Sequence, residues 1–173
     1  SSQSRGLGDV YKRQIIVRID VMTNRTRTPC VGICSTTYGD EVCRGCKRFS
    51  FEVINWNAFN PEERESVWKR LEKLKSQIMD SRLKIYEPEK LKNSINRYQL
   101  KIKDDLNDLS KAFEIIKQVS ESFSNLEEFG IEIFEKNKAL VEIKDEIENE
   151  LYTLSKAHYE KYFVEPLKRK KSK

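Results

Sequence analysis

Apolar residues recur every three or four positions through most of the chain after residue 60, which is the spacing of one face of an α-helix. The first such stretch opens with helix-start residues: Asn60 can cap a helix, Pro61 suits its first position, and Glu63 can complete a capping box. We predict a helix from Pro61 to about Ser81. Its buried stripe should consist of Val67, Leu71, Leu74 and Ile78, with Trp68 beside it.

Two further helical regions follow the same spacing. Glu87-Pro88 opens a second helix, whose apolar positions are Leu91, Ile95, Tyr98 and Ile102, and the pattern continues through Leu106, Leu109, Phe113, Ile116 and Phe123. We predict breaks near Ser122 to Asn125 and at Gly130. The last helix should run from about Leu140 to Tyr162, and Pro166 should lie beyond its end.

Each helix has only one narrow apolar face, so it is not buried on all sides. That face must pack against another helix of the chain or against a partner. We predict a mainly α fold in which a small irregular four-Cys metal-binding module is followed by an antiparallel helical hairpin or bundle. An extended coiled-coil dimer is the alternative, but Pro88 interrupts any long heptad run. The predicted divisions are 1–21, a non-native or disordered leader; 22–75, the module with its following helix; 76–167, the helical domain; and 168–173, a basic disordered tail. Ile15 to Met22 could instead form an extra strand.

Charge narrows the classes of function. The formal net charge is +5, but residues 1–21 carry four basic and two acidic groups, and five basic residues lie in the last six positions. The sequence between them is close to neutral, so it lacks the broad basic face typical of nucleic-acid-binding domains. The mean hydropathy of −0.71 and the absence of a long apolar run exclude a membrane span. Without a secretory signal in the sequence, we expect a cytoplasmic protein.

The strongest chemical signal is the cysteine spacing. All four cysteines lie within seventeen residues, as Cys30-x3-Cys34 and Cys43-x2-Cys46. Gly32 and Gly45 can supply the backbone angles that a turn around a metal requires, and Tyr38-Gly39-Asp40 can reverse the chain between the pairs. A module of this size buries too little apolar surface to be stable unaided. We therefore predict that Cys30, Cys34, Cys43 and Cys46 bind one metal centre.

The spacing leaves the metal open, because four thiolates suit both zinc and iron–sulfur clusters. The eight-residue gap is short for a zinc ribbon, and the bacterial ferredoxin spacing is absent. Cys43-Arg44-Gly45-Cys46 alone could act as a dithiol redox motif, although no thioredoxin-like strand–helix pattern surrounds it.

These residues resemble a known family. Arg27 to Thr36, Asp40 to Cys46, and Trp56 ahead of Pro61-Glu62-Glu63-Arg64 are similar to the bacterial family catalogued as domain of unknown function 1289. Its members are described as predicted iron–sulfur proteins, so the resemblance implies an iron–sulfur cluster ligated by the four cysteines. The later chain, including Leu151 to Tyr162, resembles the helical extension of longer gammaproteobacterial members.

The remaining candidates have simpler explanations. Phe49, Phe51, Ile54, Trp56 and Phe59 should form a small core behind the metal, on and after a short helix that begins near Ser50. Arg44, Lys47 and Arg48 should be a solvated turn rather than a phosphate-binding surface. The single histidine, His158, should be a packing or surface group, and no catalytic constellation is present.

Taken together, the residues predict a non-enzymatic metal-binding protein. An iron–sulfur cluster would serve electron transfer or redox sensing, and the alternative is a structural zinc module in a protein- or nucleic-acid-binding adaptor. The helical region should contact another protein, with nucleic acid a weaker candidate.

Overall fold

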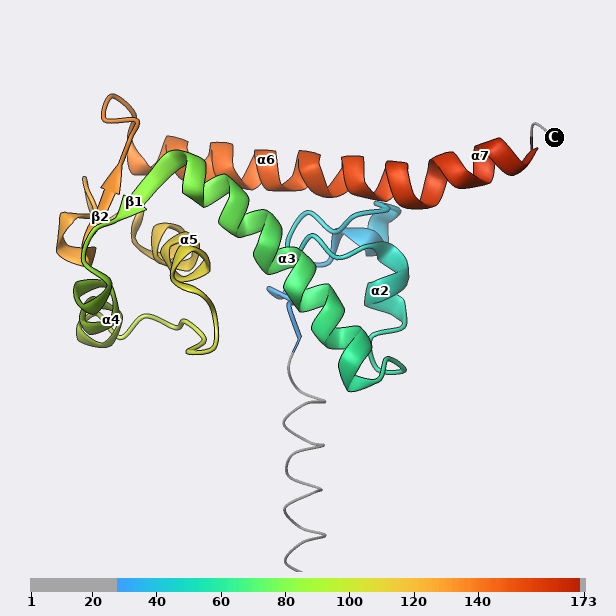
Figure 1. Ribbon diagram of the computed structural model, residues 1–173, viewed down its shortest axis with the longest axis horizontal. Helices are drawn as coiled ribbons and strands as arrows, with labels where there is room; N and C mark the ends of the chain where they lie inside the picture. Colours follow the sequence, from blue (N-terminus) through green and yellow to red (C-terminus); the bar gives the residue numbers. More distant parts are fainter. Residues whose placement is uncertain (1–27, 172–173) are drawn as a thin grey trace, which may run out of the picture.

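The computed structural model describes residues 28–171, and this part of the chain is mainly helical, as predicted (Figure 1). The predicted leader, residues 1–21, lies outside the described residues. The elements in chain order are the 3-10 turn η1 (Ser35–Tyr38), α2 (Ser50–Ile54), α3 (Pro61–Arg82), β1 (Leu83–Ile85), α4 (Pro88–Arg97), α5 (Asp108–Val119), the 3-10 turn η2 (Glu127–Phe129), β2 (Ile131–Ile133), α6 (Leu140–Tyr159), the π-helical segment η3 (Glu160–Val164) and α7 (Glu165–Lys171).

Helix α3 begins as its sequence predicts. The Asn60 side chain accepts a hydrogen bond from the Glu63 amide at 2.8 Å, and the Glu63 carboxylate accepts one from the Asn60 amide at 2.8 Å. These two bonds satisfy amides that the first helical turn leaves without partners. The predicted stripe of Val67, Leu71, Leu74 and Ile78 is buried, which confirms the predicted helical face.

The region after α4 is where the predicted helical pattern fails. Helix α4 ends at Arg97, and Gln99 adopts a left-handed φ of 51°, so Ile102 lies in a loop rather than on the helix. Helix α5 then starts at its own cap, where the Asn107 side chain accepts from the Ser110 amide at 2.8 Å. A residue with left-handed backbone angles does not continue a right-handed helix, and a glutamine in the sequence gives no sign of that conformation.

The structure contains a two-stranded antiparallel sheet that was not predicted from the sequence. It pairs the strand that follows α3 with the strand that follows η2. Strand β1 continues directly from α3 and pairs with β2, with Leu83 opposite Ile133 and Ile85 opposite Ile131. Gly130, at φ 67°, makes the turn into β2, so the predicted break at this glycine is confirmed.

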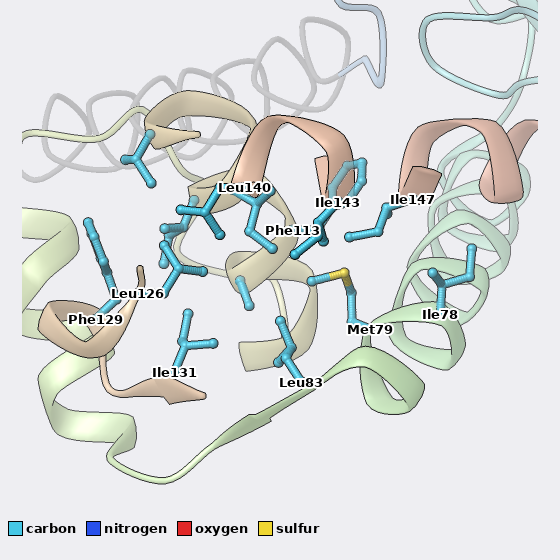
Figure 2. Packing of buried hydrophobic residues seen from close by; sticks show 14 of the residues in the cluster. Ile78, Met79, Leu83, Phe113, Leu126, Phe129, Ile131, Leu140, Ile143 and Ile147 are labelled. Atoms are coloured by element: carbon cyan, nitrogen blue, oxygen red, sulfur yellow. The ribbon is translucent and has the colours of Figure 1, made fainter. Parts of the chain in front are cut away.

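The helices surround one main core (Figure 2). Met79 of α3 and Leu83 of β1 face Phe113 of α5, Ile131 of β2 and Ile143 of α6, and each of these five side chains is at most 3% exposed. A smaller cluster joins Trp56 to Val67 and Leu71 of α3. Helix α3 therefore contributes side chains to both clusters.

The C-terminal helix continues past Pro166, although the sequence predicted that it would end before this proline. Proline lacks an amide hydrogen and collides with the preceding helical turn. Here the chain widens into the π-helical η3, with the Glu165 amide bonded to the Glu160 carbonyl, immediately before Pro166. Lys168 to Lys171 are consequently helical rather than a disordered tail, while Ser172 and Lys173 lie outside the described residues.

Candidate metal centre

The two cysteine-bearing turns pack against each other through Gly45. A β-carbon at this position would lie 2.7 Å from Cγ2 of Val31 and 2.9 Å from the Ile33 carbonyl oxygen, so only glycine allows this approach. The Arg44 amide also donates to the Ser35 hydroxyl at 2.8 Å. The turn between Cys30 and Cys34 therefore lies directly on the turn between Cys43 and Cys46.

The second pair lies inside the protein, in a tight reversal of the chain. Cys43 is 1% exposed and Cys46 is 8% exposed. The Cys43 amide donates to the Arg48 carbonyl at 2.9 Å, and the Lys47 amide donates to the Cys43 carbonyl at 2.8 Å. Lys47 adopts a left-handed φ of 63° to close this turn, an uncommon conformation for a residue with a side chain.

The environments of Cys43 and Cys46 push their pKa values in opposite directions. Burial alone would raise the pKa of Cys43, but hydrogen bonds from the amides of Cys46, Ser35 and Gly45 and from the Cys46 side chain lower it to about 7. Burial raises the pKa of Cys46, only partly offset by the Arg48 guanidinium, whose Nε lies 3.3 Å from Sγ. The thiolate of Cys43 is thus stabilised by backbone amides, which is the arrangement that favours a metal-ligating sulfur.

The first pair is closer to the surface. Cys30 is exposed, and its sulfur accepts from the Gly32 amide at 3.4 Å, with Gly32 at a φ of 101°. Cys34 is half-buried, and its sulfur lies 2.9 Å from the Thr36 hydroxyl. All four thiols are free. Within residues 28–171, no group of three or more Cys, His, Asp or Glu side chains already has the arrangement of a metal site.

One cysteine from each turn nevertheless lines the same cavity. Cys30 and Cys46 both line a cavity of about 200 Å³ that also reaches Trp68 of α3. Cys43 lies beside the other turn, with Sγ 3.9 Å from the Ile33 carbonyl oxygen. The structure thus places the two pairs on touching turns, and the Cys46 side chain helps to lower the pKa of Cys43, but within residues 28–171 the four sulfurs do not gather into one ligand group.

The predicted small core of apolar residues is mostly buried, with one exception. Phe49 and Trp56 are 2% and 5% exposed, and Phe51 and Phe59 are partly buried, but Ile54 is 79% exposed. The prediction was wrong for Ile54 because α2 is only five residues long and turns this position outward. The other side of Phe49 is covered from the far end of the chain: its ring centroid lies 5.3 Å from that of Tyr159 and 5.4 Å from that of Phe163.

The basic residues of the second turn are not the solvated group that the sequence predicted. Arg44 is exposed and paired with Asp40, but Lys47 and Arg48 are each 3% exposed. Lys47 forms an ion pair with Glu148 of α6, and the Arg48 guanidinium lies 4.8 Å from the centroid of the Trp56 ring. Through these two contacts, the second cysteine-bearing turn is linked to α6 and to Trp56.

A further buried ion pair was missed from the sequence. Glu52 of α2 is 4% exposed, accepts a hydrogen bond from the Phe49 amide at 2.9 Å, and binds both terminal nitrogens of Arg70 on α3. Its position between Phe51 and Val53 is the only trace of burial that the sequence offers. His158, in contrast, is partly exposed and packs edge-on against Tyr162 at 5.7 Å, as a packing residue would.

No helix among the described residues is long and apolar enough to cross a membrane. Neither a curated protein nor a solved structure matches the chain. A family match covers the cysteine-bearing turns, α2 and most of α3, and leaves the later helices outside it. Residues 28–75 match the family described as Protein of unknown function (DUF1289), so this four-cysteine segment is similar to that family.

Proposed function

We propose that Cys30, Cys34, Cys43 and Cys46 together bind one iron–sulfur cluster. The observation that carries the proposal is the contact between the two cysteine-bearing turns at Gly45, where a side chain of any size would force them apart. To bring four sulfurs around one centre, Cys30 and Cys34 must move toward Cys43 and Cys46, and the two turns that carry them are already in contact. The free state of all four thiols leaves every sulfur available as a ligand.

The residues around the sulfurs fit a negatively charged centre. Amides of Ser35, Gly45 and Cys46 point toward Cys43, and the Arg48 guanidinium lies against Cys46. Hydrogen bonds and nearby positive charge stabilise thiolates and tune the reduction potential of a cluster. When bound, such a cluster exchanges single electrons, which serves electron transfer or the sensing of oxidants.

The test is the composition of the full chain purified without oxygen. A bound cluster gives brown protein with broad visible absorption, and stoichiometric iron and acid-labile sulfide. The variant in which all four cysteines are serine is the control and should contain neither. Colourless protein with one equivalent of zinc would replace the proposal with its alternative, a structural zinc module, because zinc uses the same four thiolates. Protein that holds no metal after reconstitution with either would refute both.

We also propose that the helical region contacts a protein partner at its C-terminal end. Tyr162 and Leu167 are 58% and 61% exposed there, close to the aromatic side chains that cover Phe49. A double Tyr162→Ser and Leu167→Ser variant should lose a partner that co-purifies with the native chain and should keep its metal content. If binding instead falls steeply with added salt and requires Lys168 to Lys171, the partner is a nucleic acid.

A further inference from the structure

The cavity that Cys30 and Cys46 share extends well beyond the cysteines. It lies where the cysteine-bearing turns meet α3, α5, α6 and the loop between α4 and α5, and its apolar walls include Trp68, Leu71 and Phe113. Lys101 and Lys103 are exposed at one side of it, whereas Lys47 is 3% exposed. The cavity therefore connects the surface with a buried cation.

Positive charge exceeds negative charge around this space. Among the described residues that line it, five are lysines and one is a glutamate: Lys47, Lys75, Lys101, Lys103, Lys117 and Glu114. Lys47 and Lys117 share Glu148, which lies outside the lining, and Lys75 and Lys117 share Glu114. In this inner group, three ammonium groups surround two carboxylates.

An aromatic ring lies beside two of the inner lysines. The Lys75 and Lys117 ammonium groups lie 4.9 and 5.4 Å from the Phe113 ring centroid. A ring face attracts a cation more weakly than a carboxylate does. Burial lowers the pKa of Lys75, the ion pair with Glu114 raises it, and the charges of Lys117 and Lys47 lower it by smaller effects because these cations repel one another. A bound anion would relieve that repulsion.

We infer that this cavity binds a small multivalent oxyanion of the phosphate class, held by Lys47, Lys75 and Lys117 and reached past Lys101 and Lys103. The volume of about 200 Å³ decides the size of the ligand, because pockets for nucleotide- and drug-sized molecules are usually about 300 to 1,000 Å³. Ammonium groups bind phosphate oxygens through charge-assisted hydrogen bonds. The cavity is also lined by Cys30 and Cys46, which are ligands of the proposed cluster, but lysine side chains rather than thiolates hold this ligand.

The experiment is a calorimetric titration of the full chain with inorganic phosphate, with the metal content of each sample measured in parallel. We expect saturable binding of one phosphate per chain. Lys117→Gln should weaken it about tenfold or more, since one charge-assisted hydrogen bond contributes on that scale. Lys101→Gln, at the exposed side, should weaken it by less than about fivefold. Lys69→Gln is the matched control, because Lys69 is an exposed lysine next to Trp68 that does not line the cavity.

Chloride at matched ionic strength separates a phosphate site from general screening of the lysines. The inference is overturned if phosphate gives no saturable heat, if chloride reproduces the effect, or if Lys117→Gln binds as tightly as Lys69→Gln. If no sample holds metal but phosphate still binds, the anion site is supported and the cluster proposal fails. If the samples hold the cluster but do not bind phosphate, the cluster proposal is supported and the anion site fails.

Discussion

Lys47 and Glu148 form an ion pair between residues 101 positions apart in the sequence, and it joins the second cysteine turn to α6. The Lys47 side chain is 4% exposed, and its ammonium group also donates to the Gly45 carbonyl at 3.1 Å. The same residue thus closes the cysteine turn through its backbone and anchors that turn to the helical region through its side chain.

Glu148→Gln should lower the free energy of unfolding by about 1 to 3 kcal/mol, because it leaves the buried Lys47 ammonium without a charged acceptor. Chemical denaturation measures the loss. Asp145→Asn on the same helix is the control: the Asp145 side chain is 64% exposed, and this variant should stay within about 0.5 kcal/mol of the native chain. Equal losses in the two variants would show that the ion pair does not stabilise the fold.

Cys43→Ser should abolish metal binding and destabilise the segment 28–75, because Cys43 is 1% exposed and lies in the contact between the two turns. His158→Ala should leave the metal content unchanged, since His158 is a partly exposed residue packed on Tyr162. Metal analysis and thermal unfolding of both variants test this ranking. Loss of metal in the histidine variant alone would contradict the assignment of the ligands.

Gly45→Ala should also remove the metal, for a steric reason. The added methyl group meets the Ile33 carbonyl oxygen at 2.9 Å, and backbone moves less readily than the end of a side chain. Gly39→Ala is a matched control at φ 97° with no atom within 4 Å: it should cost about 1 to 2 kcal/mol of stability through backbone strain and retain the metal. Metal content measured under identical loading conditions distinguishes the two. Full loading of Gly45→Ala would show that contact between the turns is not required.

In metal-free protein, the thiolate absorbance in the ultraviolet should show a step near pH 7 that Cys43→Ser lacks. The folded-state pKa lies below the ordinary value of 9.0, so the folded protein releases this proton at lower pH than the unfolded chain does. The contribution of Cys43 to stability is therefore complete above about pH 9 and disappears as the pH falls through about 7. A single step near pH 9 would show that the amides do not stabilise this thiolate.

Local signals in the sequence predicted the parts of the fold that depend on neighbouring residues. Asn60 and Glu63 are three positions apart, and their reciprocal hydrogen bonds form as predicted. The three-residue strands Leu83–Ile85 and Ile131–Ile133 do alternate apolar and charged residues, but so short a pattern does not distinguish a strand from a helix end. Gln99 and Lys47 adopt left-handed backbone angles that their residue types do not suggest.

Burial of charge at the cysteine turns could not be predicted, because the partners are distant in the sequence. In the sequence, Arg44, Lys47 and Arg48 resemble an ordinary exposed basic cluster. In the structure, Glu148 lies beside Lys47 and Trp56 lies beside Arg48. The four cysteines were found from spacing alone, and their role as ligands to a single metal centre stays a prediction. Contact between their turns depends on Gly45, which the sequence marked only as a residue with backbone freedom.

The packing of Phe49 against Tyr159 and Phe163 has a consequence for the order in which the protein is made. A ribosome adds about 5 to 20 residues per second, so roughly 5 to 20 seconds separate the synthesis of Phe49 from that of its aromatic neighbours. During this interval the Phe49 ring of the nascent chain lacks the two rings that cover it in the folded protein. Under the proposed function, a metal has time to enter the cysteine-bearing segment before the end of α6 and η3 pack against it.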